Sequence, residues 1–214
     1  MSMPTDIGII DTMIEFPHRN MKALYKFITD QTHDAESKES FEFPVEYMYK
    51  DVPDKKLQHI DDPVALTLAE MDRWGIEKGM VGVGGPDSPG AKALKAHPDR
   101  FIPSGHADPN KGMDGIRQIR RLKDEYDIRA IGAFPSGTFP QVAINDPLMY
   151  PIYATCAELG IAVFCCAGVP GPRLKMAPQR VELIDEVMYD FPELTFVTRH
   201  GCEPWEDLAV KLML

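Results

Sequence analysis

The chain has 214 residues, of which 44% are hydrophobic, 26% charged and 9% aromatic, a composition typical of one large globular domain rather than a disordered tail, a collagen-like rod or a disulfide scaffold. The formal net charge of −10 is spread along the chain, which argues against a nucleic acid or an anionic membrane as the main partner. No apolar stretch approaches the ~18 residues of a membrane span and the N-terminus does not resemble a signal peptide, so we expect a cytoplasmic protein with four reduced cysteines.

Short apolar runs alternate with segments of helical period along the chain. The candidate strands are, in chain order, 7–13, 80–84, 101–104, 128–134, 161–166 and 195–200. Helices are expected between them, and their starts are marked by a capping oxygen followed by proline at Asp62-Pro63, Ser88-Pro89 and Asp146-Pro147. The alternation predicts an α/β fold of six βα units.

Two architectures can hold six βα units. Strands from the second onward start roughly 28 residues apart, so two more units would complete a (β/α)8 barrel of the usual ~250 residues. The alternative, an open doubly wound sheet, predicts a glycine-rich phosphate turn after the first strand, and the sequence has none there. We therefore predict that residues 1–214 form a single TIM-like (β/α) barrel domain, truncated after the sixth βα unit.

A long insertion, residues 16–60, follows the first predicted strand and holds seven of the 19 aromatic residues. Long loops at the C-terminal rim of a barrel cover the active site or meet a second subunit. We expect this insertion to act as a lid or as a contact in a homodimer. A loop folded over its own small core is the alternative.

A motif near the C-terminus carries a family resemblance. Phe191-Pro192 precedes a predicted strand, and the strand runs into His200-Gly201-Cys202-Glu203-Pro204-Trp205. This pattern resembles the sixth-strand segment of the amidohydrolase-related family, which includes aminocarboxymuconate-semialdehyde decarboxylase and related decarboxylases, hydratases and lactonases. The resemblance implies a barrel enzyme, a hydrolase or carbon–carbon lyase, acting on a small carboxylate-bearing metabolite. Supporting similarities are His97-Pro98-Asp99-Arg100-Phe101, Glu158-Leu159-Gly160-Ile161 and Ala167-Gly168-Val169-Pro170-Gly171.

The same resemblance implies zinc or another divalent metal, held by histidines on strands one, five and six and by an aspartate on strand eight. At the matching positions this chain has Met13, Glu15, Cys166 and His200, and a thioether such as that of Met13 binds zinc poorly. Glu15, Cys166 and His200 could still form a mixed metal site. Alternatively, Met13 packs in the barrel, Cys166 is a small buried hydrophobe and Glu15 pairs with an arginine or a backbone donor. We predict no cofactor and no stoichiometric zinc for this chain.

The catalytic candidates are His200 as general acid, base or ligand, Glu15 as base or ligand, and Asp11 as base or orienting group. Arg173 and Arg199 could bind a substrate carboxylate bidentately, and His106 could contact the substrate. Loss of the metal ligands is compatible with activity, since the pyrone-dicarboxylate lactonases resemble this fold and hydrolyse without metal. The competing interpretation is a non-catalytic barrel retained for binding or assembly.

Overall fold

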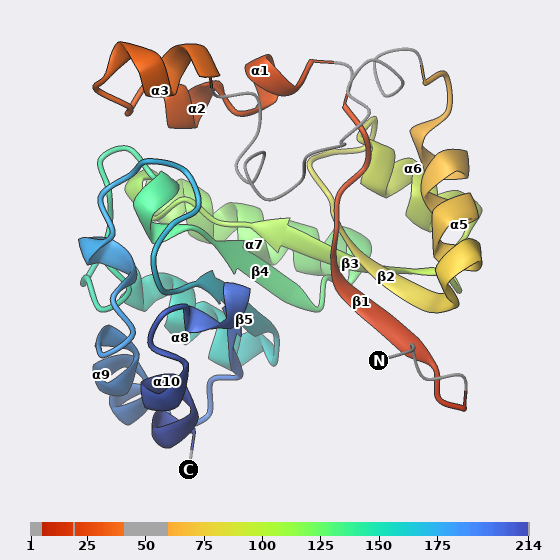
Figure 1. Cartoon of the computed structure of the whole chain (residues 1–214). Helices are drawn as coiled ribbons and strands as arrows, with labels where there is room; N and C mark the ends of the chain where they lie inside the picture. The colour runs from red at the N-terminus through yellow and green to blue at the C-terminus, as the bar shows by residue number, and fades with distance from the viewer. Residues whose placement is uncertain (1–5, 19, 41–59, 214) are drawn as a thin grey trace.

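Six parallel strands form one curved sheet in the computed structural model, which describes residues 6–18, 20–40 and 60–213 (Figure 1). Each strand pairs with its neighbour in sequence, so the spatial order equals the chain order. This order confirms the predicted α/β barrel topology and excludes a doubly wound sheet, whose strand order would reverse at a switch point. The strands are β1 (Ile9–Ile14), β2 (Ile76–Gly82), β3 (Phe101–His106), β4 (Ala130–Ala133), β5 (Ala162–Cys166) and β6 (Phe196–Arg199).

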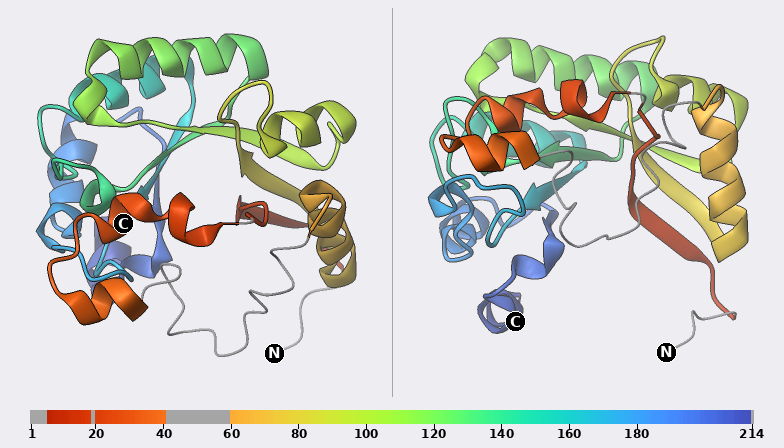
Figure 2. Two further views of the ribbon diagram at one scale, coloured as in Figure 1. Left: turned by 90° about the horizontal axis from the view of Figure 1, so that it is seen from above. Right: turned by 45° about the horizontal axis from the view of Figure 1, so that its top comes forward.

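The main helices lie around the outside of the strands (Figure 2). Asp62 caps the first of them by accepting from the backbone N–H groups of Val64 and Ala65, both at 3.0 Å, and Ser88 caps the second. Both predicted starts are thereby confirmed. The helices are α5 (Pro63–Trp74), α6 (Pro89–Ala96), α7 (Met113–Tyr126), α8 (Tyr150–Leu159), α9 (Leu183–Asp190) and α10 (Glu206–Leu212).

Two predicted boundaries were wrong. The strand expected at 80–84 is β2, which begins at Ile76 because Gly75 ends α5 in a left-handed conformation and turns the chain directly into the sheet. Asp146 does not cap α8. Its carboxylate accepts from the Leu148 N–H in a turn, and the helix begins later, at Tyr150.

The sheet buries apolar residues on both faces. The main core lies between the convex face and the helices and contains Val163, Cys165 and the central part of α8. A smaller cluster covers the concave face, because side chains alternate across each strand. Its members are Met80, Ala130 and Phe164, packed with Ile102, Ala162 and Val197.

The described part of the insertion forms three short helices, α1 (Met21–Leu24), α2 (Lys26–Thr29) and α3 (Ala35–Ser40), at the carboxyl ends of the strands (Figure 1). Gln31 donates to the Gly137 carbonyl beyond β4, and the ring of Phe27 meets Phe134 edge-on at 6.5 Å. This placement suits a lid. Residues 41–59 of the insertion lie outside the described residues, and the homodimer contact stays a prediction. Within the described ranges no helix is long and apolar enough to cross a membrane.

Candidate functional site

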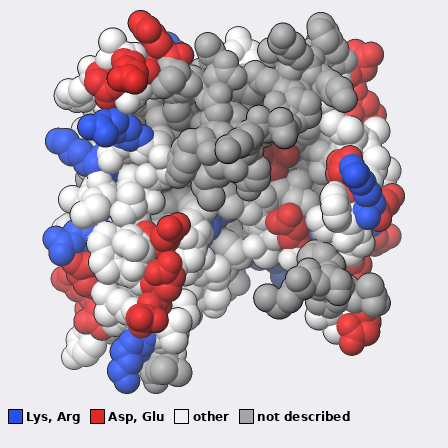
Figure 3. Space-filling model, viewed as in Figure 1, with Lys and Arg blue, Asp and Glu red and all other residues white. Residues whose placement is uncertain are grey.

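β1 and β6 are the two ends of the sheet, and Figure 3 shows a notch in the lower part of the molecule between these two sides. Strand pairing places His106, Gly132, Phe164 and Val197 in one row across β3 to β6. Arg199 pairs with Cys166 in the next row toward the carboxyl ends. The chemistry-bearing residues of this row and the next therefore meet at the rim where barrel enzymes place their active sites.

Arg199 lies at the centre of this site. Its guanidinium carbon is 5.7 Å from the centroid of the Phe164 ring, and its side chain passes so close to Gly132 that a β-carbon there would be 3.4 Å from Nη1. The guanidinium also lies beside Cys166, the residue that pairs with Arg199; burial raises the pKa of that thiol, and the charge of the guanidinium lowers it by a smaller amount. The Nε atom is buried and has no hydrogen-bond partner within the described ranges. A permanent cation with an unused donor thus faces the concave side.

His106 ends β3 beside this cation. It pairs with Gly132 of β4, and in a neutral imidazole one ring nitrogen is able to accept a proton. Desolvation and the charge of Arg199 lower the pKa of His106 below its ordinary value. The imidazole is therefore neutral at neutral pH.

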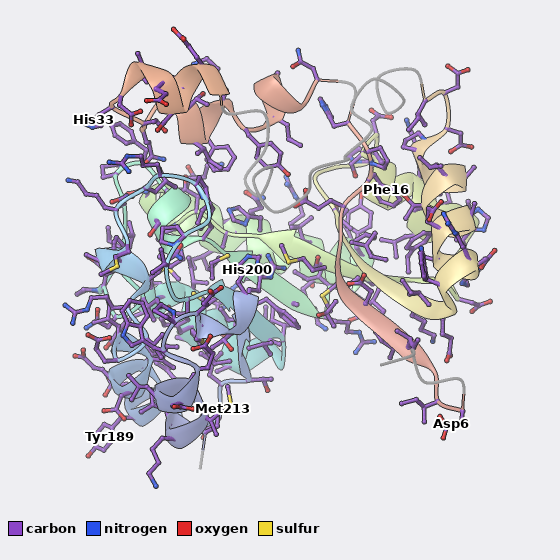
Figure 4. The ribbon with its side chains drawn as sticks, viewed as in Figure 1. Asp6, Phe16, His33, Tyr189, His200 and Met213 are labelled. Atoms are coloured by element: carbon purple, nitrogen blue, oxygen red, sulfur yellow. The ribbon has the colours of Figure 1, made fainter. Side chains whose placement is uncertain are left out.

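His200 follows Arg199 at the end of β6, in a left-handed conformation with φ 64°, near the middle of the molecule (Figure 4). Desolvation, and then the charge of Arg199, lower its pKa. Arg199 thus acts on both histidines, and His200 is also a neutral imidazole at neutral pH.

The β1 candidates do not all share one face. Asp11 pairs with Gly79, whose β-carbon position faces Ile14 and Met71 in the outer layer, and the register shifts between Asp11 and Ile14. Ile14 packs outward against the α5 and α6 layer, so Met13 and Glu15 on either side of it face the concave side. The carboxylate of Asp11 accepts from the Met13 N–H at 2.9 Å, and Oε2 of Glu15 accepts from the Tyr25 hydroxyl at 3.0 Å. The partner of Glu15 is therefore a tyrosine of the insertion.

These residues do not fit a metal ion. Among the residues that the structure describes, no three His, Cys, Asp or Glu side chains gather as a metal site, so Glu15, Cys166 and His200 are not brought together. Burial raises the pKa of the Cys166 thiol to about 11, which keeps it protonated, and metals bind the thiolate. Met13 is 46% exposed rather than packed in the barrel. The guanidinium of Arg199 would also repel a cation beside Cys166.

Arg173 does not join Arg199. Its Nε lies 3.3 Å from Oδ2 of Asp34, and the side chain is 78% exposed. Arg173 links the loop after β5 to the insertion. The two arginines that were both predicted to bind a substrate carboxylate therefore have different surroundings. Cys165 faces away from the site, into the outer core.

Sequence reasoning missed three residues that shape the site. Gly132 and Phe164 lie against the guanidinium, and an isolated glycine within an apolar strand is the signal that marks such a close approach. Gln179 is 2% exposed, accepts from the Ser136 N–H and donates to the Gly168 carbonyl. It ties together the loops after β4 and β5, and no sequence pattern indicated it.

Comparison with known proteins extends this description. A family model described as amidohydrolase matches residues 42–213, whereas no curated protein matches the chain. An uncharacterized TIM-barrel protein from Bordetella bronchiseptica is 24% identical with a TM-score of 0.65, over 96% of this chain and 71% of that one. 5-Carboxyvanillate decarboxylase from Novosphingobium aromaticivorans, solved with bound manganese and 3-methoxy-4-hydroxy-5-nitrobenzoic acid, is 17% identical with a TM-score of 0.65, over 96% and 69%. 4-Oxalomesaconate hydratase from Rhodopseudomonas palustris is 20% identical with a TM-score of 0.54, also over 96% and 69%. These likenesses show a shared barrel fold.

Proposed function

Because the chain belongs to the amidohydrolase family, we propose that it is a hydrolase or carbon–carbon lyase acting on a small carboxylate-bearing metabolite. One observation carries this proposal: the buried Nε of Arg199, which has no partner in the described part of the chain, faces the concave side at the carboxyl ends of the strands. A buried donor without a partner is costly, and a carboxylate is a group that arginine binds well through paired hydrogen bonds. Two of the similar structures, 5-carboxyvanillate decarboxylase and 4-oxalomesaconate hydratase, support the same substrate class.

Two neutral imidazoles beside the guanidinium could move the proton that either reaction requires. In the neutral imidazole of His106 one nitrogen carries the hydrogen and the other can accept a proton. In hydrolysis an imidazole takes a proton from the attacking water and returns it to the leaving oxygen. In decarboxylation the carbon that loses CO₂ must receive a proton, so an imidazole that is neutral at rest would first have to take that proton up from the solvent or from another acid.

A screen of cyclic esters and unsaturated carboxylates with the purified protein tests this proposal. Ring opening without gas identifies a hydrolase, and CO₂ release identifies a decarboxylase. His106→Asn and His200→Ala are compared with the unmodified protein, and we expect at least one to lower kcat by about 10²-fold or more. Equal rates in all three would exclude both imidazoles as catalytic groups.

A non-catalytic barrel is the second candidate, favoured by the lack of a metal-ligand group among the described residues. It predicts carboxylate binding without turnover of any compound in the screen. Binding and turnover are therefore measured on the same preparations.

A further inference from the structure

We infer that Arg199 supplies the positive charge of the active site in place of a metal ion, so that the concave face takes up a carboxylate and rejects a divalent cation. The choice of a carboxylate rests on the proposed function. The rejection of a cation is independent of the proposed function, because it follows from the position of the guanidinium alone.

The guanidinium occupies the space that a metal bound through β5 would need. Arg199 pairs with Cys166, and the guanidinium carbon lies 5.7 Å from the centroid of the Phe164 ring, two residues earlier in β5. A metal bound to Cys166 would have to displace this donor and would then sit beside a charge that arginine does not lose.

Gly132 lies directly against the guanidinium. A β-carbon there would be in van der Waals contact with it, 3.4 Å from Nη1 and 3.6 Å from Nη2 of Arg199, so the further atoms of a branched side chain would compete with the guanidinium for space. Gly132 also pairs with His106 of β3. The cation and the imidazole are thus positioned by one short stretch of β4.

The unused donor sets the class of ligand. The guanidinium offers the buried Nε–H, which has no partner among the described residues. A planar carboxylate can accept from Nε–H and a terminal N–H side by side, as arginine–carboxylate pairs commonly do. A spherical cation can satisfy neither donor.

Three measurements on the purified protein test the inference. Elemental analysis without chelator is expected to find less than roughly 0.1 zinc or manganese ion per chain, and added Zn²⁺ should leave the Tm unchanged. Calorimetric titration with benzoate, at constant ionic strength, is expected to show binding that Arg199→Gln weakens by about tenfold or more, since hydrogen bonds to charged groups are lost. Arg199→Lys keeps the charge but lacks the paired donors, so its benzoate affinity should lie between those of the unmodified protein and Arg199→Gln.

Arg117→Gln is the matched control. Arg117 lies on α7, is 70% exposed and pairs with Asp114, so its replacement should leave benzoate binding unchanged. If Arg199→Gln does not fold, Gly132→Val displaces the guanidinium without removing it and should abolish benzoate binding.

Each adverse outcome has a definite meaning. About one metal ion per chain, or benzoate affinity equal in the unmodified protein and in Arg199→Gln, would overturn the inference. Lack of benzoate binding to the folded, unmodified protein would do the same. Benzoate binding that depends on Arg199, without turnover of any compound in the screen, would contradict only the proposed enzymatic function.

Discussion

The hydroxyl of Tyr25 donates a 3.0 Å hydrogen bond to Oε2 of Glu15, which joins the insertion to the end of β1. Desolvation and the nearby carboxylate raise the pKa of Tyr25, so the phenol remains a donor throughout the physiological pH range. The ring centroid of Phe27 lies 6.4 Å from that of Tyr25, and Phe27 also contacts Phe134, which follows β4. The insertion is thus anchored on both sides of the concave face.

Replacing Tyr25 with phenylalanine should loosen this anchor. The change removes one hydrogen bond to a carboxylate but keeps the ring, so we expect the free energy of unfolding to fall by about 1–2 kcal/mol. Limited proteolysis should cut within residues 20–40 sooner than in the unmodified protein. Tyr189→Phe is the control, because Tyr189 is 87% exposed on α9. Unchanged cleavage in Tyr25→Phe would show that the bond does not hold the insertion.

The order of the strands was predictable because βα units of regular length connect neighbouring parallel strands with one handedness. The start of β2 was not, since Glu77 and Lys78 interrupt the apolar run that marks a strand. Arg199 and His106 could be selected as candidates by residue type. Their proximity to Gly132 depends on the register of β3 to β6, which one sequence does not reveal.

The two histidines near Arg199 should make stability fall in acid. Well above pH 6.5 both imidazoles are neutral in the folded and unfolded chains. As the pH falls through 6.5, the unfolded chain binds protons that the folded protein resists, because the folded pKa values of His106 and His200 are lowered. The free energy of unfolding should therefore decrease until the pH reaches the folded pKa values.

Urea unfolding between pH 4.5 and 8 measures this slope. His106→Asn and His200→Asn should each flatten it, and the double variant should flatten it most. His97→Asn is the control, since His97 lies at the end of α6, away from Arg199. A slope that none of the site variants alters would show that the histidines near Arg199 do not control acid stability.

Gln179 should be important for stability because of its buried hydrogen bonds with Ser136 and Gly168. Gln179→Ala leaves the buried Ser136 N–H and the Gly168 carbonyl without their side-chain partner, and it opens a cavity. We expect a loss of about 2–4 kcal/mol in urea unfolding. Gln118→Ala on the partly exposed face of α7 should cost less than about 1 kcal/mol. Equal losses in the two variants would mean that the Gln179 contacts add nothing specific.

The close approach of α6 to β2 gives the sharpest test of the fold. A β-carbon at Gly90 would lie 2.1 Å from the carbonyl oxygen of Gly82, a backbone atom that cannot move without disturbing the strand. Gly90→Ala should therefore push α6 off the sheet and destabilise the protein by about 1–3 kcal/mol, as overpacking does. At Gly82 itself a β-carbon would meet nothing within 4 Å, so Gly82→Ala should be neutral or stabilise by up to about 1 kcal/mol through the unfolded chain. The two variants carry the same substitution on either side of one contact, and thermal unfolding compares their stabilities. A Gly90→Ala variant as stable as Gly82→Ala would show that α6 is not packed against the end of β2.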